Sequence, residues 1–119
     1  MVRSSLLRSI ICSLLLVTPA WAGPSNVLTW TDNSNNEMNF NIERKTEACT
    51  GTLPFFPLGS VGTNVTIYTD SAVTEGMTYC YRVNASNAGG ASDYSNTASR
   101  TVPFTVPAPP SGLTVTPGP

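Results

Sequence analysis

The apolar residues that follow position 25 occur in short runs, and within these runs they alternate with polar residues. The clearest run covers residues 78–86, in which Tyr79, Tyr81 and Val83 share one face. Alternation of this kind is the period of a half-buried strand, and no window after residue 22 shows a long helical period. The pattern therefore restricts the chain to an all-β fold made of short strands.

We expect six strands, over residues 26–30, 39–45, 55–61, 65–70, 78–86 and 94–102. Clusters of turn-forming residues, such as 32–36 and 87–90, separate them, which predicts an antiparallel β-sandwich. Pro57 and Gly59 place the third strand at a sheet edge. The inward face of 65–70 stays open, because Val65 and Ile67 compete with Tyr68. Alternation predicts a core formed by these residues: Leu28, Trp30, Phe40, Ile42, Tyr79, Tyr81 and Val83.

Residues 1–22 have the pattern of a cleaved secretory signal. Arg3 and Arg8 precede an apolar run over residues 10–17, and Ala20-Trp21-Ala22 offers a small-residue cleavage site. A membrane-spanning segment needs about 20 apolar residues, so this run is too short to be an anchor. We expect a protein that does not span the membrane, begins at Gly23 and is secreted to the extracellular space or the periplasm.

Charge and composition exclude several functions. Without the two arginines of the signal, four basic and seven acidic residues remain, which gives a net charge of −3 and no basic surface for nucleic acid. The chain has no histidine, so it lacks the residues of a Ser-His-Asp or Cys-His site and of a histidine zinc site.

Two cysteines, Cys49 and Cys80, follow the signal. An even number in an exported chain predicts one disulfide bond. A metal or redox pair is the alternative, but the CxxC spacing is absent and no histidine could complete a metal site.

The acidic residues do not suggest a catalytic pair. They are scattered over expected loops and strand surfaces, so we expect them in solvent: Asp32, Glu37, Glu43, Glu47, Asp70, Glu75 and Asp93. Residues 32–36 alternate oxygen donors as a calcium loop does, but they lack the glycine and the distal glutamate of an EF-hand. We therefore predict no catalytic, cofactor-binding or metal-binding residues and no enzymatic activity.

A resemblance to a known family rests on several segments in order. Trp30 is followed by FNIERK, YTD, EGMTYCYRVNASNAGG and DYSN. Together they resemble a fibronectin type III domain of the kind frequent in secreted bacterial proteins, over roughly residues 26–102. The resemblance makes Trp30 the strand B tryptophan. It makes Tyr79 the tyrosine of the corner before strand F, where we expect its hydroxyl to bond a backbone carbonyl. It also implies that the disulfide lies on the outer face, where strand C ends beside the start of strand F.

The chain departs from this family at its first strand. Strand A should precede Trp30, but only residues 23–25 separate the predicted cleavage site from strand B. We therefore divide the chain into a signal (1–22), a fibronectin type III-like domain (23–102) and a tail (103–119), and the tail resembles a Pro-rich linker and the strand A of a further repeat. Two explanations stay open: the chain is a piece of a tandem array, or its tail replaces the missing strand.

The family resemblance implies a secreted, non-catalytic module for spacing or for binding a protein. An accessory module of an extracellular polysaccharide-degrading enzyme is the alternative, and a truncated fragment of a larger repeat protein is another. The partner, a protein or a polysaccharide, is not specified by the residues. The tail, over residues 107–119, offers a segment for strand exchange with another molecule.

Overall fold

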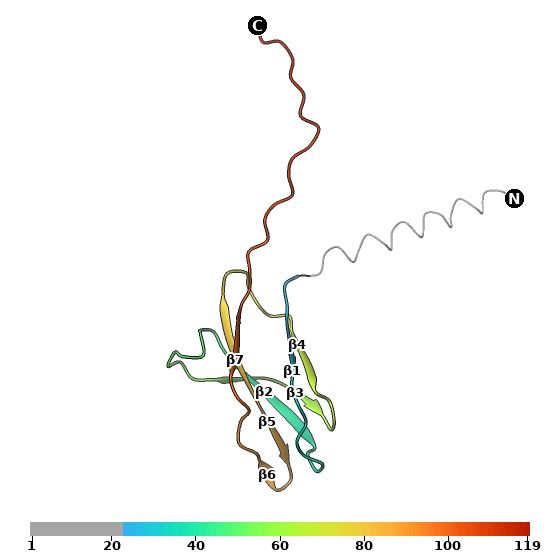
Figure 1. Ribbon diagram of the computed structural model, residues 1–119, viewed down its shortest axis with the longest axis vertical. Coiled ribbons are helices and arrows are strands. Elements are labelled where there is room, and N and C mark those ends of the chain that lie inside the picture. Colours follow the sequence, from blue (N-terminus) through green and yellow to red (C-terminus); the bar gives the residue numbers. More distant parts are fainter. Residues whose placement is uncertain (1–22) are drawn as a thin grey trace, which may run out of the picture.

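The computed structural model describes residues 23–119, so the signal predicted over residues 1–22 lies outside the described residues. Seven strands follow one another (Figure 1): β1 (Asn26–Thr29), β2 (Asn39–Lys45), β3 (Phe56–Gly62), β4 (Ile67–Asp70), β5 (Thr78–Asn87), β6 (Gly90–Ala91) and β7 (Ala98–Thr101). They form two antiparallel sheets, one of β1 and β4 and one in the order β3-β2-β5-β6, with β7 also paired to β5. The all-β sandwich predicted from the sequence is confirmed. Residues 23–119 contain no helix of the length and hydrophobicity that a membrane crossing requires.

The core lies between the two sheets, where the alternating residues of β2 and β5 meet those of β1 and β4. Five of the residues expected there are buried: Phe40, Ile42, Tyr79, Tyr81 and Val83. Leu28 and Trp30 are partly buried and pack against this cluster, with the rings of Trp30 and Phe40 5.6 Å apart. Val73 and Val102 complete the cluster from the segments outside the strands.

The structure settles which face of β4 points inward. Tyr68 packs against the core, whereas the side chain of Ile67 is 52% exposed. The ring of Tyr68 crosses to the facing sheet and lies over Gly59 of β3. A Cβ atom at position 59 would come within 2.6 Å of the Tyr68 hydroxyl oxygen, so any other residue would require the Tyr68 ring to shift. β3 lies at the end of its sheet, as the proline in its sequence indicated.

The last predicted strand, over residues 94–102, is shorter than expected: β7 covers only Ala98–Thr101, and a separate short strand, β6, lies before it at Gly90–Ala91, where a turn was predicted over residues 87–90. β6 and β7 pair with opposite ends of β5, and residues 92–97 between them bulge away from it. Ser92 and Ser95 hold this bulge: each donates its backbone N–H to β5, to the carbonyls of Ala85 and Val83, respectively. Their hydroxyls accept the N–H groups of the same two residues at 2.9 and 3.0 Å. Serine hydroxyls thus replace the carbonyls of a regular ladder, which alternation alone could not reveal.

Candidate functional site

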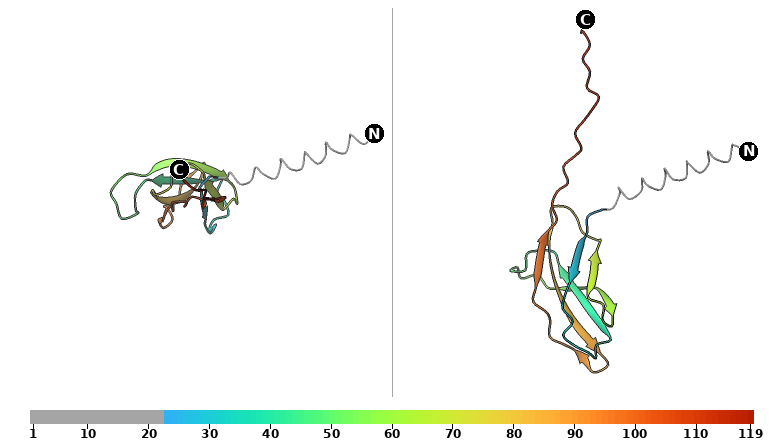
Figure 2. Two further views of the ribbon diagram at one scale, coloured as in Figure 1. Left: turned by 90° about the horizontal axis from the view of Figure 1, so that it is seen from above. Right: turned by 45° about the vertical axis from the view of Figure 1, so that its right-hand side comes forward.

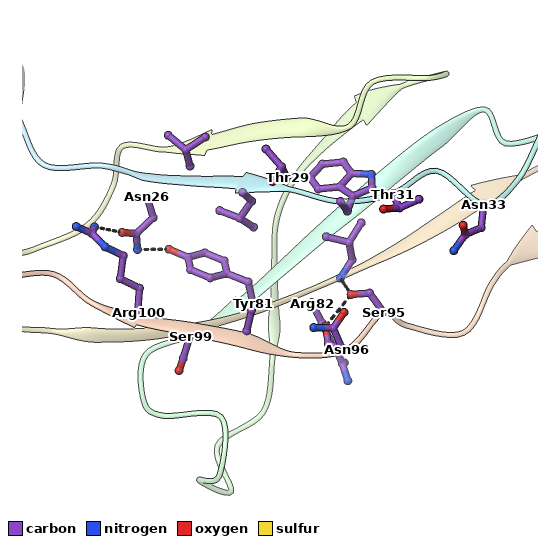
Figure 3. A pocket seen from close by; sticks show the side chains of 15 residues that line it. Asn26, Thr29, Thr31, Asn33, Tyr81, Arg82, Ser95, Asn96, Ser99 and Arg100 are labelled. Carbon is purple, nitrogen blue, oxygen red and sulfur yellow. Dashed lines mark hydrogen bonds between the residues drawn. The ribbon is translucent and has the colours of Figure 1, made fainter.

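A groove of about 680 Å³ opens between β1 of one sheet and β7 of the other (Figure 3). Its apolar lining comes from both sheets: Leu28, Trp30, Tyr81 and Val83. Polar side chains line its two ends, with Asn26 and Arg100 at one end and Asn33 and Ser95 at the other. A groove with an apolar floor and polar ends suits an extended peptide segment.

The backbone of β1 forms one rim of this groove. Just after β1, Trp30 N donates to Thr66 O, which lies just before β4. This bond shows which residues of β1 direct their backbone N–H and C=O groups toward β4. In the antiparallel register, Asn26 and Leu28 bond to β4 as Trp30 does. The N–H and C=O groups of Val27 and Thr29 therefore point away from β4 toward the groove. No strand of residues 23–119 pairs with this edge.

A chain of polar contacts, buried at its centre and partly buried at its two arginines, joins the two sheets at one end of the groove. Arg100 of β7 donates to Asn26 Oδ1 at 2.6 Å, and Asn26 Nδ2 donates to the Tyr81 hydroxyl at 2.8 Å. The Tyr81 hydroxyl donates to Asp70 Oδ2 at 2.7 Å, and Arg44 donates to the same oxygen at 2.9 Å. We call these five residues the polar bridge. It holds β1 and β7 at a fixed separation, so the groove is preformed.

Burial and hydrogen bonding oppose each other at the centre of the polar bridge. Desolvation would raise the pKa of Asp70, but hydrogen bonds from Tyr81 and Arg44 outweigh it, so the pKa lies below its ordinary value of 3.8. Burial raises the pKa of Tyr81 to about 12, and the neighbouring Asp70 carboxylate adds to the effect. Asp70 is therefore ionised and accepts hydrogen bonds from Arg44, Tyr81 and the backbone N–H of Ala72.

The expectation that all seven acidic side chains lie in solvent was wrong for two of them. Asp70 is 2% exposed and Glu37 is 5% exposed. The sequence does contain a signal for Asp70, because alternation in 67–70 places it on the same face as Tyr68. That signal was ambiguous until the inward face of β4 was known.

The loop that resembles a calcium site uses its oxygen atoms internally. Asp32 Oδ1 accepts the backbone N–H of Ser34 at 3.0 Å, and Ser34 Oγ donates to Glu37 Oε1 at 2.7 Å. Asn64 N donates to the other Glu37 oxygen at 3.0 Å. The bond from Ser34, with that from Asn64, holds the pKa of Glu37 below its ordinary value. Across residues 23–119, no three side chains of the metal-ligating types come together.

Cys49 and Cys80 form a disulfide with a Cα–Cα distance of 5.2 Å. Cys80 alternates with the inward residues of β5, so it lies on the outer face of the sheet, and it is fully buried there. Lys45 fixes the loop that contains Cys49 by donating to the carbonyls of Cys49 and Gly51 at 3.3 and 2.8 Å.

Arg82 lies beside the disulfide on this outer face. Its guanidinium group stacks on Phe55 at 4.2 Å and on Tyr94 at 3.7 Å, and it pairs with Glu43 at 2.7 Å. The aromatic rings here are therefore engaged in a structural stack, and this face does not offer them as an open platform.

Tyr79 lies where the resemblance placed it, at the corner before β5. Its ring is 4% exposed, and its hydroxyl accepts the backbone N–H of Thr74 at 2.9 Å. The expected partner was a carbonyl, and this detail was wrong: the corner is closed by an amide that donates to the phenol oxygen.

The fold of this chain is similar to that of several solved structures. No family model matches the chain, and no curated protein matches it. Solved structures do match, among them the sixth fibronectin type III domain of human fibronectin type III domain containing protein 3, with a TM-score of 0.56 and 18% identity. That match covers 77% of this chain and 83% of the human domain. The fold is that of a fibronectin type III domain.

Two further structures agree. A fibronectin type III domain of a human protein of the same name has a TM-score of 0.52 and 24% identity, and the match covers 70% of this chain and 78% of that one. The twitchin kinase region from C. elegans has a TM-score of 0.53 and 24% identity over 66% of this chain and only 14% of its own length.

The fibronectin type III fold explains why a groove lies beside β1. In an immunoglobulin-like sandwich, strand A lies beside strand B in the sheet that also contains strand E. Here β1 takes the place of strand B and β4 that of strand E, while β2, β5 and β7 correspond to strands C, F and G. The groove beside β1 is therefore the place of strand A, which no segment of residues 23–119 fills.

Replacing Tyr79 with phenylalanine should lower the free energy of unfolding by about 1 kcal/mol, because the partly buried N–H of Thr74 loses its acceptor. Urea denaturation of the two proteins measures the difference. Tyr94→Phe is the matched control, since the Tyr94 hydroxyl bonds to Glu43 at an exposed position and should contribute little. Equal small effects for both variants would show that the corner bond is not stabilising.

Proposed function

We propose that this chain acts outside the cytoplasm as a non-catalytic module that binds or spaces proteins, and that it binds them by accepting an extended strand on the open edge of β1. The observation that carries the proposal is the unpaired edge of β1 beside a preformed groove with an apolar floor. Addition of a strand to an exposed sheet edge is a general mode of peptide recognition: main-chain bonds provide affinity, and pockets for alternate side chains provide specificity.

Three properties of the chain support this proposal. The fibronectin type III fold is, in general, compatible with a binding or spacer module. The Cys49–Cys80 disulfide is compatible with an extracellular location. The buried acid nearest the groove, Asp70, is fully engaged in the polar bridge, so the groove is suited to binding rather than to catalysis.

Binding of a polysaccharide receives less support. A sugar platform needs several open aromatic faces, but Phe55 and Tyr94 both stack on Arg82. Phe56 and Phe104 are 64% and 77% exposed, but Phe56 belongs to β3 and Phe104 to the tail, and exposed rings that are scattered singly are ordinary on a protein surface.

A simple peptide tests whether the edge of β1 accepts a strand. The probe is an acetylated peptide of sequence KTVTVTK, added to protein that lacks residues 107–119 so that its own tail does not compete. Trp30 lines the groove and is the only tryptophan after residue 22, so its fluorescence reports the site directly. We expect a saturable spectral shift.

Two proline variants locate the binding edge. Thr29→Pro removes an N–H that points into the groove, so it should abolish the shift without breaking a bond to β4. Thr69→Pro removes the equivalent N–H on the far edge of β4 and should leave the shift unchanged. Absence of any shift, or equal loss in both variants, would contradict strand acceptance at β1.

The chain should be exported with its signal removed. We expect N-terminal sequencing of protein recovered outside the cytoplasm to begin at Gly23, because the small residues at 20 and 22 fit the signal peptidase site. Exported protein that still begins at Met1 would contradict the prediction.

A further inference from the structure

We propose that the strand accepted by β1 is residues 112–116 of a second copy of this chain, so that the copies join head to tail. This inference rests on the proposed function, because it names the occupant of the same edge. It combines the open edge of β1, the groove beside it and the conformation of the tail.

The start of the tail is fixed to the domain and directed away from it. Glu75 accepts the backbone N–H of Thr105 at 3.1 Å and its hydroxyl at 2.7 Å, and the ring of Phe104 packs on Gly76. Gly76 has φ +84°, and a Cβ at this position would overlap the Phe104 ring. The contact therefore depends on glycine at position 76. From Thr105 the tail continues away from both sheets (Figure 1).

The next part of the tail acts as a stiff spacer. Residues 106–111 read Val-Pro-Ala-Pro-Pro-Ser, and a Pro-rich segment of this kind extends by about 3.1 Å per residue, or roughly 19 Å in all. The spacer places residues 112–116 beyond the domain that bears them. Leu113 and Val115 are 95% and 92% exposed there. Two apolar side chains on one face of an alternating segment are thus presented to solvent without a partner among residues 23–119.

For residues 112–116 to pair with β1 of their own molecule, the stiff spacer would have to reverse its direction. The tail leaves at the end of β7, which runs opposite to β1 (Figure 2, right). A strand in the position of strand A runs antiparallel to β1, so the tail would first have to return the length of the sandwich. A tail that instead turned straight back would run parallel to β1, and parallel pairing is less stable per residue. A second molecule has neither constraint, and its tail can enter the groove in the antiparallel direction.

In the antiparallel arrangement, one register both pairs the free backbone groups of β1 and directs the apolar side chains of the tail into the groove. With Thr114 opposite Thr29, the N–H and C=O groups that point out of β1 at Val27 and Thr29 meet the main chain of the donated strand. Leu113 then lies opposite Trp30, and Val115 lies opposite Leu28. Both apolar side chains enter the groove, and the Thr114–Thr29 pair faces solvent, where a pair of threonines is favourable. Pro117 ends the strand because it has no N–H to donate.

Donation of this kind joins two different surfaces, so it produces open chains or closed rings rather than a single symmetric contact. One five-residue strand buries much less area than a standard protein interface, and we therefore expect reversible, concentration-dependent association.

Association is measured by sedimentation velocity over a range of concentrations with the exported protein. Leu113→Lys/Val115→Lys places charges in the groove and should abolish association. Thr114→Lys/Thr116→Lys adds the same charges to the same segment on its solvent face and should leave association unchanged. On the acceptor side, Thr29→Pro should abolish association and Thr69→Pro should not.

A mixture gives the decisive result, and it also distinguishes this inference from the proposed function. The Leu113→Lys/Val115→Lys protein can only accept a strand, and the Thr29→Pro protein can only donate one. Each should be monomeric alone, and together they should form a one-to-one dimer that does not grow. Persistent monomers in the mixture would overturn the inference. If the KTVTVTK peptide still shifts Trp30 fluorescence, the edge of β1 accepts strands from another source and the proposed function stands. Association that survives both inactive variants would also overturn the inference, since copies would then join elsewhere.

Discussion

Replacing both Cys49 and Cys80 with alanine should lower the free energy of unfolding by about 3–4 kcal/mol in the chain-entropy treatment of a cross-link. The two cysteines are 31 residues apart, so the bond restricts a long segment of the unfolded chain that includes β3 and β4. A domain of this size buries a modest share of its surface, so this loss is a large part of its total stability. Urea denaturation under oxidising conditions measures the change.

Chemical reduction provides a control without substitution. The wild-type protein in excess dithiothreitol should lose nearly the same free energy, and the alanine variant should not respond to the reagent. Either substitution alone removes the cross-link, so each single alanine variant should be about as unstable as the double variant. If the double variant were within about 0.5 kcal/mol of wild type, as for a surface substitution, the bond would have no stabilising role.

Replacing Asp70 with alanine should lower the free energy of unfolding by about 3 kcal/mol, at the lower end of the range for breaking a buried ion pair because Arg44 is 23% exposed. The substitution leaves Arg44, the Tyr81 hydroxyl and the N–H of Ala72 without their common acceptor. Asp93→Ala is the matched control, because Asp93 is an exposed acid and its loss should change stability little.

The dependence of stability on pH gives an independent test of the lowered pKa of Asp70. The pKa of Asp70 is lowered in the folded protein, so its contribution is present above the ordinary pKa of 3.8 and is lost as the pH falls through the folded value. Wild-type stability should therefore decrease below about pH 4, and the Asp70→Ala protein should show a shallower decrease. Parallel curves for the two proteins would show that folding does not lower the pKa of Asp70.

The sequence predicted the fold because alternation in 39–45 and 78–86 is strict and each strand has one apolar face. It predicted less where a side chain's role depends on a neighbour distant in the sequence. Asp70 was placed in solvent because the inward face of residues 67–70 was ambiguous and because its partners, Arg44 and Tyr81, lie in other strands. Ser95 was predicted to lie in a regular strand, and the bonds that Ser92 and Ser95 make to β5 were not anticipated, because a hydroxyl that replaces a carbonyl leaves the polar pattern unchanged.

The sequence indicated only that β1 has an unpaired edge, and it did not indicate the groove beside that edge. The expectation that strand A is missing indicated unpaired backbone on β1, but the polar bridge that holds β7 apart from β1 requires contacts across more than 70 residues, from Asn26 to Arg100. The bonds between Glu75 and Thr105, which direct the tail outward, join residues that are 30 apart in the sequence, so local patterns do not reveal them either.

Amide hydrogen exchange at Thr29 tests strand donation most directly, because the Thr29 N–H points into the groove and has no partner within residues 23–119. In full-length exported protein we predict slow exchange that becomes slower as the concentration rises, and fast exchange at every concentration once residues 107–119 are deleted. The N–H of Thr69, which points off the far edge of β4, serves as an internal control and should exchange fast in both proteins. Fast exchange at Thr29 under all conditions would contradict donation, and slow exchange that does not depend on concentration would show that the tail closes on its own domain.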